Sequence, residues 1–256
     1  MNRIEKFFRY GISGILNGVQ AVPHLEIHLR TAPSTDGRFS FDVPVARCRN
    51  IIQQQFTGNS NPFVSAARAL IRDNVNEAEH ILLTYYETNK PDSLFSCFLY
   101  SRDLAGSGEY NSRSQPPSLI MPPWDSMRRR DVQKLRRKTV VHPLIGPQAT
   151  EAVRSQIKRY LSVYRSIKQH DYQPNVFGHI QGYVLDRGDD AVFVATSGKH
   201  RIAVLAALGW ERIPVTFKPN MPPCFCLCQS HYWPNVVNGL YSVEEAEMIF
   251  NGYFAS

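Results

Sequence analysis

The sequence contains no long apolar run. No stretch of its 256 residues approaches the roughly 20 consecutive apolar residues that a membrane-spanning helix requires. Its first residues, MNRIEKFFRYGISGILNGV, carry charges within their apolar part and no cleavage site of small residues, so we expect no secretory signal peptide. Cysteine is also scarce, with five residues. These absences argue against a disulfide-rich secreted domain and lead us to expect a cytoplasmic protein with free thiols.

Acidic residues are fewer than basic ones. The chain has 22 Asp and Glu against 29 Lys and Arg, a formal charge of +7. This surplus favours anionic partners such as phosphates, nucleotides, nucleic acids or acidic glycans, without choosing among them. A hydrophobic content of 43% with 20% charged residues is ordinary globular composition, and the length suffices for one large core or two smaller ones.

Hydrophobic periodicity predicts an α+β (mixed α/β) fold. Apolar residues at helical spacing predict helices over 3–19, 61–70, 77–89, 149–170, 200–208 and 242–250. Apolar runs bounded by turns predict strands over 179–186, 191–195 and 212–217, with a hairpin turn at 187–190. We expect Thr150 to cap the helix over 149–170, Gly209 to end the helix over 200–208, and Ser242 with Glu245 to form a capping box.

The loop-rich stretch 101–123 marks a boundary or a long active-site loop. We therefore predict a mainly helical N-terminal region over 1–125, a basic linker or loop over 126–148, and a C-terminal module over 149–256. The amphipathic helix over 3–19 is expected to pack on its own domain or, as an alternative, to lie in a membrane interface.

A basic segment lies in the predicted linker. Seven of its eleven residues are Lys or Arg: Arg128, Arg129, Arg130, Lys134, Arg136, Arg137 and Lys138. The segment is either a solvated charged face or a docking patch for a polyanion, namely nucleic acid, an anionic lipid or an acidic glycan. Aromatic residues are not interleaved with these charges, which argues against a track for single-stranded nucleic acid.

The segment VFVATSGKHRIAVLAALGWERIPVTF, residues 192–217, places a glycine, two permanent cations and a histidine between a strand and a helix. A glycine at a strand end allows close approach of the backbone to a ligand, and the first turn of a helix attracts anions. Lys199 and Arg201 add donors for phosphate oxygens, and His200 adds a hydrogen-bond donor or a proton carrier. The pattern indicates phosphate binding or, as the alternative, ordinary surface charges at a helix start.

The stretch from Leu161 to Phe217 resembles the ParB/sulfiredoxin superfamily. YRSIKQHDYQPNVFGHIQGYVL is similar to that family's opening helix, turn and strand, and TSGKHRIAVLAALGWERIPVTF resembles its Gly-x-His-Arg signature with the helix and the Ile-Pro-Val strand that follow. In that family the turn holds nucleotide phosphates. The resemblance therefore implies phosphate-binding roles for Ser197, Gly198, Lys199, His200 and Arg201.

The chain departs from this family at three points. Lys199 replaces the reactive cysteine of sulfiredoxins, which argues against sulfinic-acid repair, and Ser197 replaces an acidic residue of the serine-kinase branch. A substitute carboxylate would come from Asp171, Asp186, Asp189 or Glu151; we take Asp171 as the general base and expect Asp189 and Asp190 to form a turn. Only 39 residues follow Phe217, with one clear helix, which argues against specific DNA recognition.

The wider chain is also similar to uncharacterised bacterial proteins encoded among surface-polysaccharide genes. The stretches that carry this similarity are LLTYYETNKPDS (82–93), PPW (122–124), GPQATE (146–151) and WPNVVNGLYSVEEAEMIF (233–250). It implies a place in polysaccharide assembly, with a peripheral membrane or assembly partner, but no particular activity.

Three further groups of residues leave alternatives open. Cys224, Cys226 and Cys228 with His231 are either thiols packed on one strand face or a metal site of three thiolates and an imidazole. His142 and Gln148 belong to an active-site loop or to a simple turn. Trp124 and Trp233 are core anchors or a platform for stacking a sugar.

These observations together predict a phosphotransferase that uses ATP or another nucleoside triphosphate. Lys199, His200 and Arg201 would hold phosphates screened by Mg²⁺, with His200 and Asp171 as catalytic residues and the hydroxyl of a sugar or small metabolite as acceptor. The alternatives are a nucleotide-responsive binding protein without turnover, and a nucleic-acid-binding protein that uses Arg128–Lys138.

Overall fold

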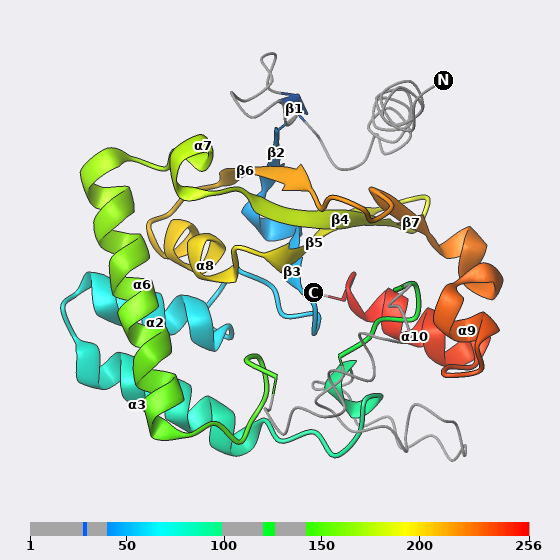
Figure 1. Cartoon of the computed structure of the whole chain (residues 1–256), viewed down its shortest axis with the longest axis horizontal. Coiled ribbons are helices and arrows are strands. Elements are labelled where there is room, and N and C mark those ends of the chain that lie inside the picture. The colour runs from blue at the N-terminus through cyan, green and yellow to red at the C-terminus, as the bar shows by residue number, and fades with distance from the viewer. Residues whose placement is uncertain (1–27, 30–39, 99–119, 126–141, 256) are drawn as a thin grey trace.

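The computed structural model of the chain describes residues 28–29, 40–98, 120–125 and 142–255 (Figure 1). The helix predicted over 3–19 and the basic segment Arg128–Lys138 lie outside the described residues, so both stay predictions. Helices and a mixed sheet occur together, which confirms the α+β fold class. None of the described helices combines the length and the apolar composition that crossing a membrane requires.

A mixed sheet runs through the middle of the molecule. The described strands are β1 (His28–Leu29), β2 (Phe41–Pro44), β3 (Cys48–Asn50), β4 (Ile180–Asp186), β5 (Ala191–Ser197), β6 (Arg212–Phe217) and β7 (Cys224–Cys226). Their order is β1-β2-β6-β4-β5-β3, and β7 also pairs with β4. Both β6 and β7 run parallel to β4 along one edge: β6 pairs with the first half of β4 and β7 with the second.

The hairpin predicted between the strands over 179–186 and 191–195 is confirmed. Strands β4 and β5 are antiparallel, and the Arg187 amide donates to the Asp190 carbonyl at 2.9 Å across the turn. Asp189 pairs with Arg187, and Asp190 pairs with Arg47. As expected, both carboxylates therefore serve the turn and its neighbours. This hairpin also sets the direction in which β5 delivers the chain to the next helix.

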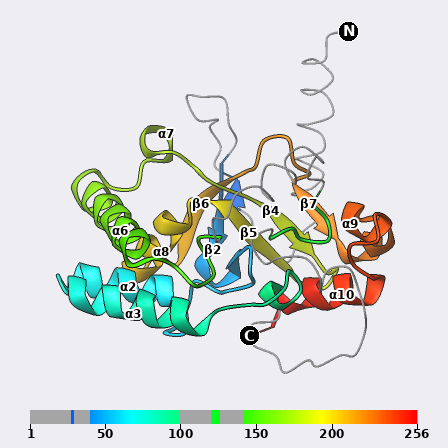
Figure 2. The ribbon, with the colours of Figure 1, turned by 60° about the horizontal axis from the view of Figure 1, so that its bottom comes forward.

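Four helices pack together beside the sheet. They are α2 (Pro62–Ile71), α3 (Val75–Thr88), α6 (Thr150–His170) and α8 (Lys199–Ala207). Helix α2 contacts α3 and α8, and α6 contacts α3 and α8, so the four form one cluster (Figures 1 and 2). Short helix α7 (Pro174–Phe177) follows α6. The predicted cap at Thr150 is wrong, because Ala149 is the N-cap residue and no side chain caps α6.

The end of the sheet that lies away from these four helices is covered by C-terminal elements. These are the 3₁₀-helix η4 (Leu227–Tyr232) and helices α9 (Pro234–Val237) and α10 (Val243–Gly252); two further 3₁₀-helices, η2 (Val45–Arg47) and η3 (Ser96–Phe98), precede them in the chain. The predicted capping box of Ser242 and Glu245 is confirmed at α10. Trp124 and Trp233 are 1% and 3% exposed, and their ring centroids are 5.2 Å apart. They therefore anchor the core and are not a sugar platform.

The hydrophobic core joins residues 41–50 to the C-terminal module. Phe41 of β2 packs edge-on against Phe193 of β5 at 6.1 Å, and β3 runs parallel to β5. The N-terminal region therefore contributes strands to the same sheet as the C-terminal module. The division of the chain at 126–148 stays a prediction.

The cysteines differ from the expectation of free thiols. Cys48, Cys97 and Cys224 are thiols outside any disulfide, but Cys226 and Cys228 form a disulfide with each other. Cys226 ends β7 and Cys228 lies in η4, so the three sulfurs of 224–228 do not alternate along one strand. The alternative of a three-thiolate metal site is therefore wrong. Within the described ranges no group of three His, Cys, Asp or Glu side chains is arranged to bind a metal ion.

Candidate phosphate-binding site

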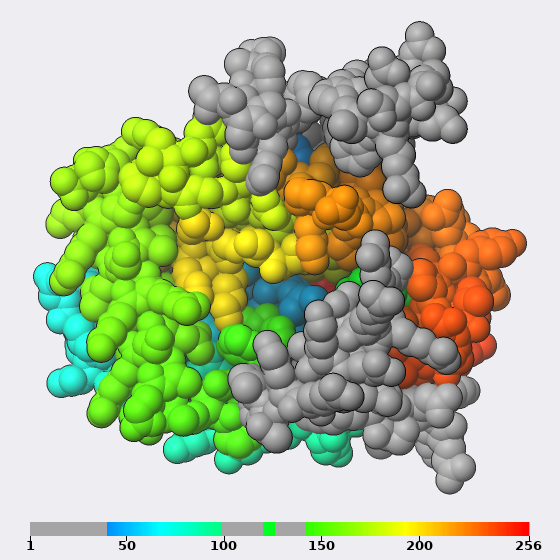
Figure 3. Space-filling model, viewed as in Figure 1, coloured from blue at the N-terminus to red at the C-terminus, as the bar shows by residue number. Residues whose placement is uncertain are grey.

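The site begins where β5 ends at Ser197 and Gly198 turns the chain into α8. Gly198 has φ 83° and ψ 17°, a left-handed conformation that favours glycine. A Cβ at this position would lie 3.0 Å from both Cα and Cγ1 of Ile180 on β4. The turn is thus pressed against the first residue of β4. In the space-filling view, yellow atoms, the colour of β5 and α8, reach the surface between α6 and the segment that follows β6 (Figure 3).

The leading amides of α8 have no acceptor within their own helix. The Gly198 carbonyl accepts from the amides of Arg201 at 2.9 Å and Ile202 at 3.1 Å. The amides of Lys199 and His200 occupy the first two helical positions, where an α-helix offers no internal acceptor. No side chain caps this helix start. Donors and the positive end of the helix dipole therefore meet at one point, an arrangement that attracts anions.

Lys199 turns from the helix towards a neighbouring loop. Its Nζ donates to the Pro143 carbonyl at 3.2 Å and lies 5.6 Å from the centroid of the Phe63 ring on α2. Burial lowers the pKa of Lys199 to about 8, and the charge of Arg159 on α6 acts in the same direction. The ammonium group is therefore held against a neutral carbonyl and an aromatic face, close to another cation.

Arg201 holds the loop between α6 and β4 against the turn. Its guanidinium group donates to the Phe177 carbonyl at the end of α7. Gly178 follows with φ 91°, and a Cβ there would lie 3.1 Å from the Arg201 Nη2. The Tyr172 hydroxyl donates to the Gly178 carbonyl at 3.3 Å, which fixes the same loop. Arg201 thus faces a carbonyl at the site, as Lys199 does.

His200 lies against α6. Its ring meets the Tyr160 ring edge-on at 4.7 Å, and its buried Nε2 has no hydrogen-bond partner among the described residues. Burial lowers the pKa of His200 to about 3, and the charges of Lys199, Arg159 and Arg201 act in the same direction. The imidazole is therefore neutral at physiological pH. A neutral imidazole with so low a pKa is suited to donate a hydrogen bond and is a weak proton acceptor.

The cations around the turn lack acidic partners. Where the structure describes the chain, its ion pairs join Arg47, Arg72, Arg154 and Arg187 to carboxylates elsewhere. Lys199, Arg201 and the exposed Arg159 take part in none of them. Like charges gathered without a counter-ion disfavour one another. An anionic ligand would relieve this repulsion, which makes the turn the best candidate for a binding site.

The loop from His142 to Gln148 lies beside this turn, because its Pro143 carbonyl accepts from Lys199 Nζ. Burial and the charge of Lys199 lower the pKa of His142 to about 4. The His142 Nδ1 accepts from the Leu144 amide at 3.3 Å. Gln148 instead donates to the carbonyls of His142 and Ile145, at 3.0 and 2.8 Å. Within the loop, His142 is the residue near the cations and Gln148 fixes the turn.

The predicted carboxylate is not brought to the cations. Asp171 is exposed at the end of α6, and its Oδ1 accepts from the Tyr172 amide at 2.9 Å. It forms no hydrogen bond or ion pair with Lys199, His200 or Arg201. The alternatives Asp186 and Asp189 lie at the opposite end of the β4–β5 hairpin, where they bond Gly188 and Arg187. Glu151 lies in the exposed first turn of α6.

Several residues of the site were not predicted from the sequence. Arg159 and Tyr160 come from α6, Phe63 from α2, and the carbonyls of Pro143 and Phe177 from two loops. Tyr160 follows Ile157 by three positions on the buried face of α6, so helical spacing gives a signal for its burial. No local pattern indicates the other four.

Comparison with protein-family models, with curated proteins and with solved structures finds no match to this chain. The resemblance to the ParB/sulfiredoxin superfamily therefore stays a prediction from the motif at Gly198–Arg201.

Proposed function

We propose that the chain binds the phosphates of a nucleoside triphosphate at the β5–α8 turn and transfers a phosphoryl group to a hydroxyl of a sugar or small metabolite. The supporting observation is the set of cations at an uncapped helix start. Lys199, Arg201 and Arg159 gather there without an acidic partner among the described residues. Backbone donors, the helix dipole and these side chains all favour the same type of ligand, a polyanion.

Lys199 and Arg201 can exchange their present hydrogen-bond acceptors for the oxygens of a phosphate. Each now donates to a carbonyl that carries no net charge, whereas a phosphate oxygen adds the attraction of an opposite charge to the hydrogen bond. Arg201 would bind two phosphate oxygens through its planar fork, Lys199 would act as a point charge, and neutral His200 would donate one hydrogen bond. The described residues offer no ready set of Mg²⁺ ligands. An accompanying Mg²⁺ therefore fits only as an ion carried by the nucleotide phosphates and water.

Binding of ATP to the full chain, with and without Mg²⁺, tests the proposal by calorimetry. Lys199→Met and Arg201→Met should each weaken binding by about tenfold or more, the effect of losing one charge-assisted contact. Lys158→Met is the matched control, because Lys158 is an exposed cation on α6 next to Arg159. Absence of ATP binding would refute the proposal, and so would an equal loss in the Lys158 variant.

The pH dependence of binding gives a second readout. A bound phosphate favours the protonated Lys199, whose pKa without ligand is about 8. The affinity for ATP should therefore be highest below pH 8 and should fall as the pH rises above it. In Lys199→Met this decrease above pH 8 should disappear. A decrease that persists in the variant would assign it to another group.

A second candidate is a nucleotide-responsive binding protein without turnover, acting in polysaccharide assembly. Phosphotransferases usually need a group that accepts the proton of the hydroxyl. In the described segments no carboxylate bonds or pairs with the cations of the turn, and this favours binding without turnover. Labelled ATP and candidate glycans distinguish the two. Labelled product supports the transferase, and saturable binding without product over long incubation supports the binding protein. Binding of nucleic acid by Arg128–Lys138 stays a prediction, tested by its salt dependence.

A further inference from the structure

We propose that Cys226 and Cys228 form a redox-active disulfide that exchanges with external dithiols. The pair lies at the end of β4 that carries β7, whereas the phosphate-binding turn contacts Ile180 at the other end. The proposal is therefore independent of the proposed function.

The two disulfide-bonded cysteines are more exposed to solvent than Cys48 and Cys97. Cys228 is exposed and Cys226 is half-buried, whereas Cys48 and Cys97 are buried. Exchange requires that a thiolate reaches a sulfur of the disulfide, so access decides which cysteines react. Cys228 is the sulfur that an external thiol reaches first.

The crosslink closes a very small loop. Cys226 and Cys228 are separated by two positions, with Cα atoms 5.3 Å apart. In the chain-entropy view, the stabilisation that a disulfide gives grows with the logarithm of the number of residues in the loop that it closes. A loop with one intervening residue gains the least from this effect. A purely structural role therefore explains this disulfide poorly.

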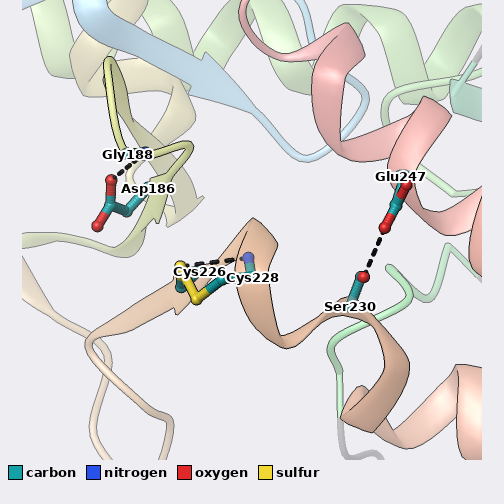
Figure 4. The surroundings of a disulfide bond; sticks show 6 residues. All are labelled: Asp186, Gly188, Cys226, Cys228, Ser230 and Glu247. Atoms are coloured by element: carbon teal, nitrogen blue, oxygen red, sulfur yellow. Dashed lines mark hydrogen bonds between the residues drawn. A yellow bond between two sulfur atoms is a disulfide. The ribbon is translucent and has the colours of Figure 1, made fainter.

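Other contacts hold both sides of the pair in place. Before the disulfide, β7 is paired with β4 from Cys224 to Cys226. After it, the Ser230 hydroxyl donates to Glu247 Oε1 at 2.6 Å, which ties η4 to α10 (Figure 4). Trp233 then stacks on Phe250 at 5.3 Å. Because these contacts do not involve the sulfurs, the two thiols would stay close together after reduction.

One hydrogen bond favours Cys226 as the leaving sulfur. The Cys228 amide donates to Cys226 Sγ at 3.3 Å (Figure 4). A donor to sulfur stabilises a thiolate, and a better-stabilised thiolate leaves faster. Asp186, the neighbour of Cys226 across the strands, directs one carboxylate oxygen to the Gly188 amide. Its negative charge opposes a thiolate nearby, so the stabilisation of the leaving sulfur comes from the Cys228 amide. Burial, with the charge of Asp186, raises the pKa of Cys224 to about 12, so this third thiol stays protonated and does not compete.

The exchange balances in two steps. An external thiolate attacks Cys228 Sγ, a mixed disulfide forms, the Cys226–Cys228 bond breaks, and the electron pair leaves on Cys226 Sγ. The second thiol of the same external molecule loses its proton to water and attacks its own mixed disulfide. It forms the external disulfide and releases Cys228 as a thiolate, and both protein thiolates are then free to take protons from water. The external dithiol is oxidised by two electrons, and the protein disulfide is reduced by two.

The test uses the full oxidised chain in a Cys224→Ser background, where Cys226 and Cys228 are the only cysteines after Cys97. The protein is equilibrated in glutathione redox buffers, free thiols are alkylated, and the C-terminal peptide is weighed by mass spectrometry. We expect reversible conversion between the disulfide and a doubly alkylated peptide inside the range of these buffers. The tryptophan and tyrosine bands of the near-ultraviolet circular dichroism spectrum should be the same for both forms, while the contribution of the disulfide itself disappears on reduction. With dithiothreitol as the probe, each oxidised chain should oxidise one equivalent.

Single variants test the assigned roles of the two sulfurs. Cys226→Ser, which leaves the exposed Cys228, should form a mixed disulfide with oxidised glutathione on the order of tenfold faster than Cys228→Ser. A peptide that stays oxidised in every buffer would overturn the proposal, as would loss of the tryptophan and tyrosine bands on reduction. Thiols that never re-form the disulfide, or equal trapping by the two variants, would also contradict it.

Discussion

At the scale of single residues, Gly198 meets two requirements of the turn, a left-handed backbone and close packing against β4. Its left-handed φ of 83° strains any other residue, and a Cβ would press on Ile180 at 3.0 Å. Gly209, at the other end of α8, has nearly the same φ of 84°, but a Cβ there would meet nothing within 4 Å. Both glycines therefore need the left-handed conformation, but only Gly198 also lacks room for a side chain.

Gly198→Ala should destabilise the fold more than Gly209→Ala. The left-handed conformation alone destabilises by about 1–2 kcal/mol, which we expect for Gly209→Ala. The contact with Ile180 should raise the loss for Gly198→Ala to about 2–3 kcal/mol. Urea unfolding of both variants measures the difference. Equal losses would show that Ile180 yields to the added methyl group.

The two histidines beside the turn should make stability depend on pH. The ordinary pKa of a histidine is 6.5, but in the folded chain the pKa of His200 is about 3 and that of His142 about 4. Between pH 6.5 and 4 the unfolded chain thus binds more protons, so the free energy of unfolding should fall as the pH falls. The slope is at most about 1.4 kcal/mol per pH unit for each histidine, and smaller because both side chains are partly exposed.

The variant His200→Asn should reduce this slope, because asparagine does not titrate. Urea unfolding at a series of pH values between 6.5 and 4 measures it, and His231→Asn, at an exposed position in η4, is the control. An unchanged slope in His200→Asn would mean that the imidazole is protonated in the folded state.

At the scale of elements, the caps separate what local sequence determines from what it does not. Ser242 accepts from the Glu245 amide at 3.1 Å, and Glu245 accepts from the Ser242 amide at 3.3 Å. Ser242→Ala should therefore lower the free energy of unfolding by about 1 kcal/mol. Thr150→Ala should change it by less than about 0.5 kcal/mol, because the cap of α6 is Ala149. Thermal unfolding of both variants tests the pair, and a larger loss at Thr150 would contradict the assignment.

The sequence predicts the elements whose signals are local. Helix α6 and strands β4 and β6 lie within a residue of their predicted bounds, because hydrophobic period and turn residues act over short distances. The pairing of β3 with β5 joins residues more than 140 positions apart, and no local pattern encodes it. The same distinction applies to the site. A local pattern predicts the motif at Gly198–Arg201, but Arg159, Phe63 and the carbonyl partners come close to it only through tertiary packing, which no local pattern encodes.

At the scale of the whole molecule, the N-terminal strands complete the C-terminal sheet. Strand β2 pairs with β6 and β3 with β5, so the two strands that flank β4 each gain a neighbour from residues 41–50. Buried Arg49 donates through Nε to the Tyr253 carbonyl at 2.9 Å, and Gln53 donates to the Ile249 carbonyl at 2.8 Å. Arg49 and Gln53 therefore also hold the end of α10. Removing these strands and side chains would leave strand edges and carbonyls without partners.

The stretch 40–98 should accordingly be required for folding of the remainder. The fragment 142–256 should lack cooperative unfolding and bind an apolar dye, because β5 and β6 each lose a neighbouring strand and α8 loses its contact with α2. The full chain should unfold in one calorimetric transition with equal calorimetric and van't Hoff enthalpies. Near-ultraviolet circular dichroism and calorimetry of both proteins provide the measurement. A fragment that unfolds cooperatively would show instead that the C-terminal module is a separate domain, as the division at 126–148 predicts.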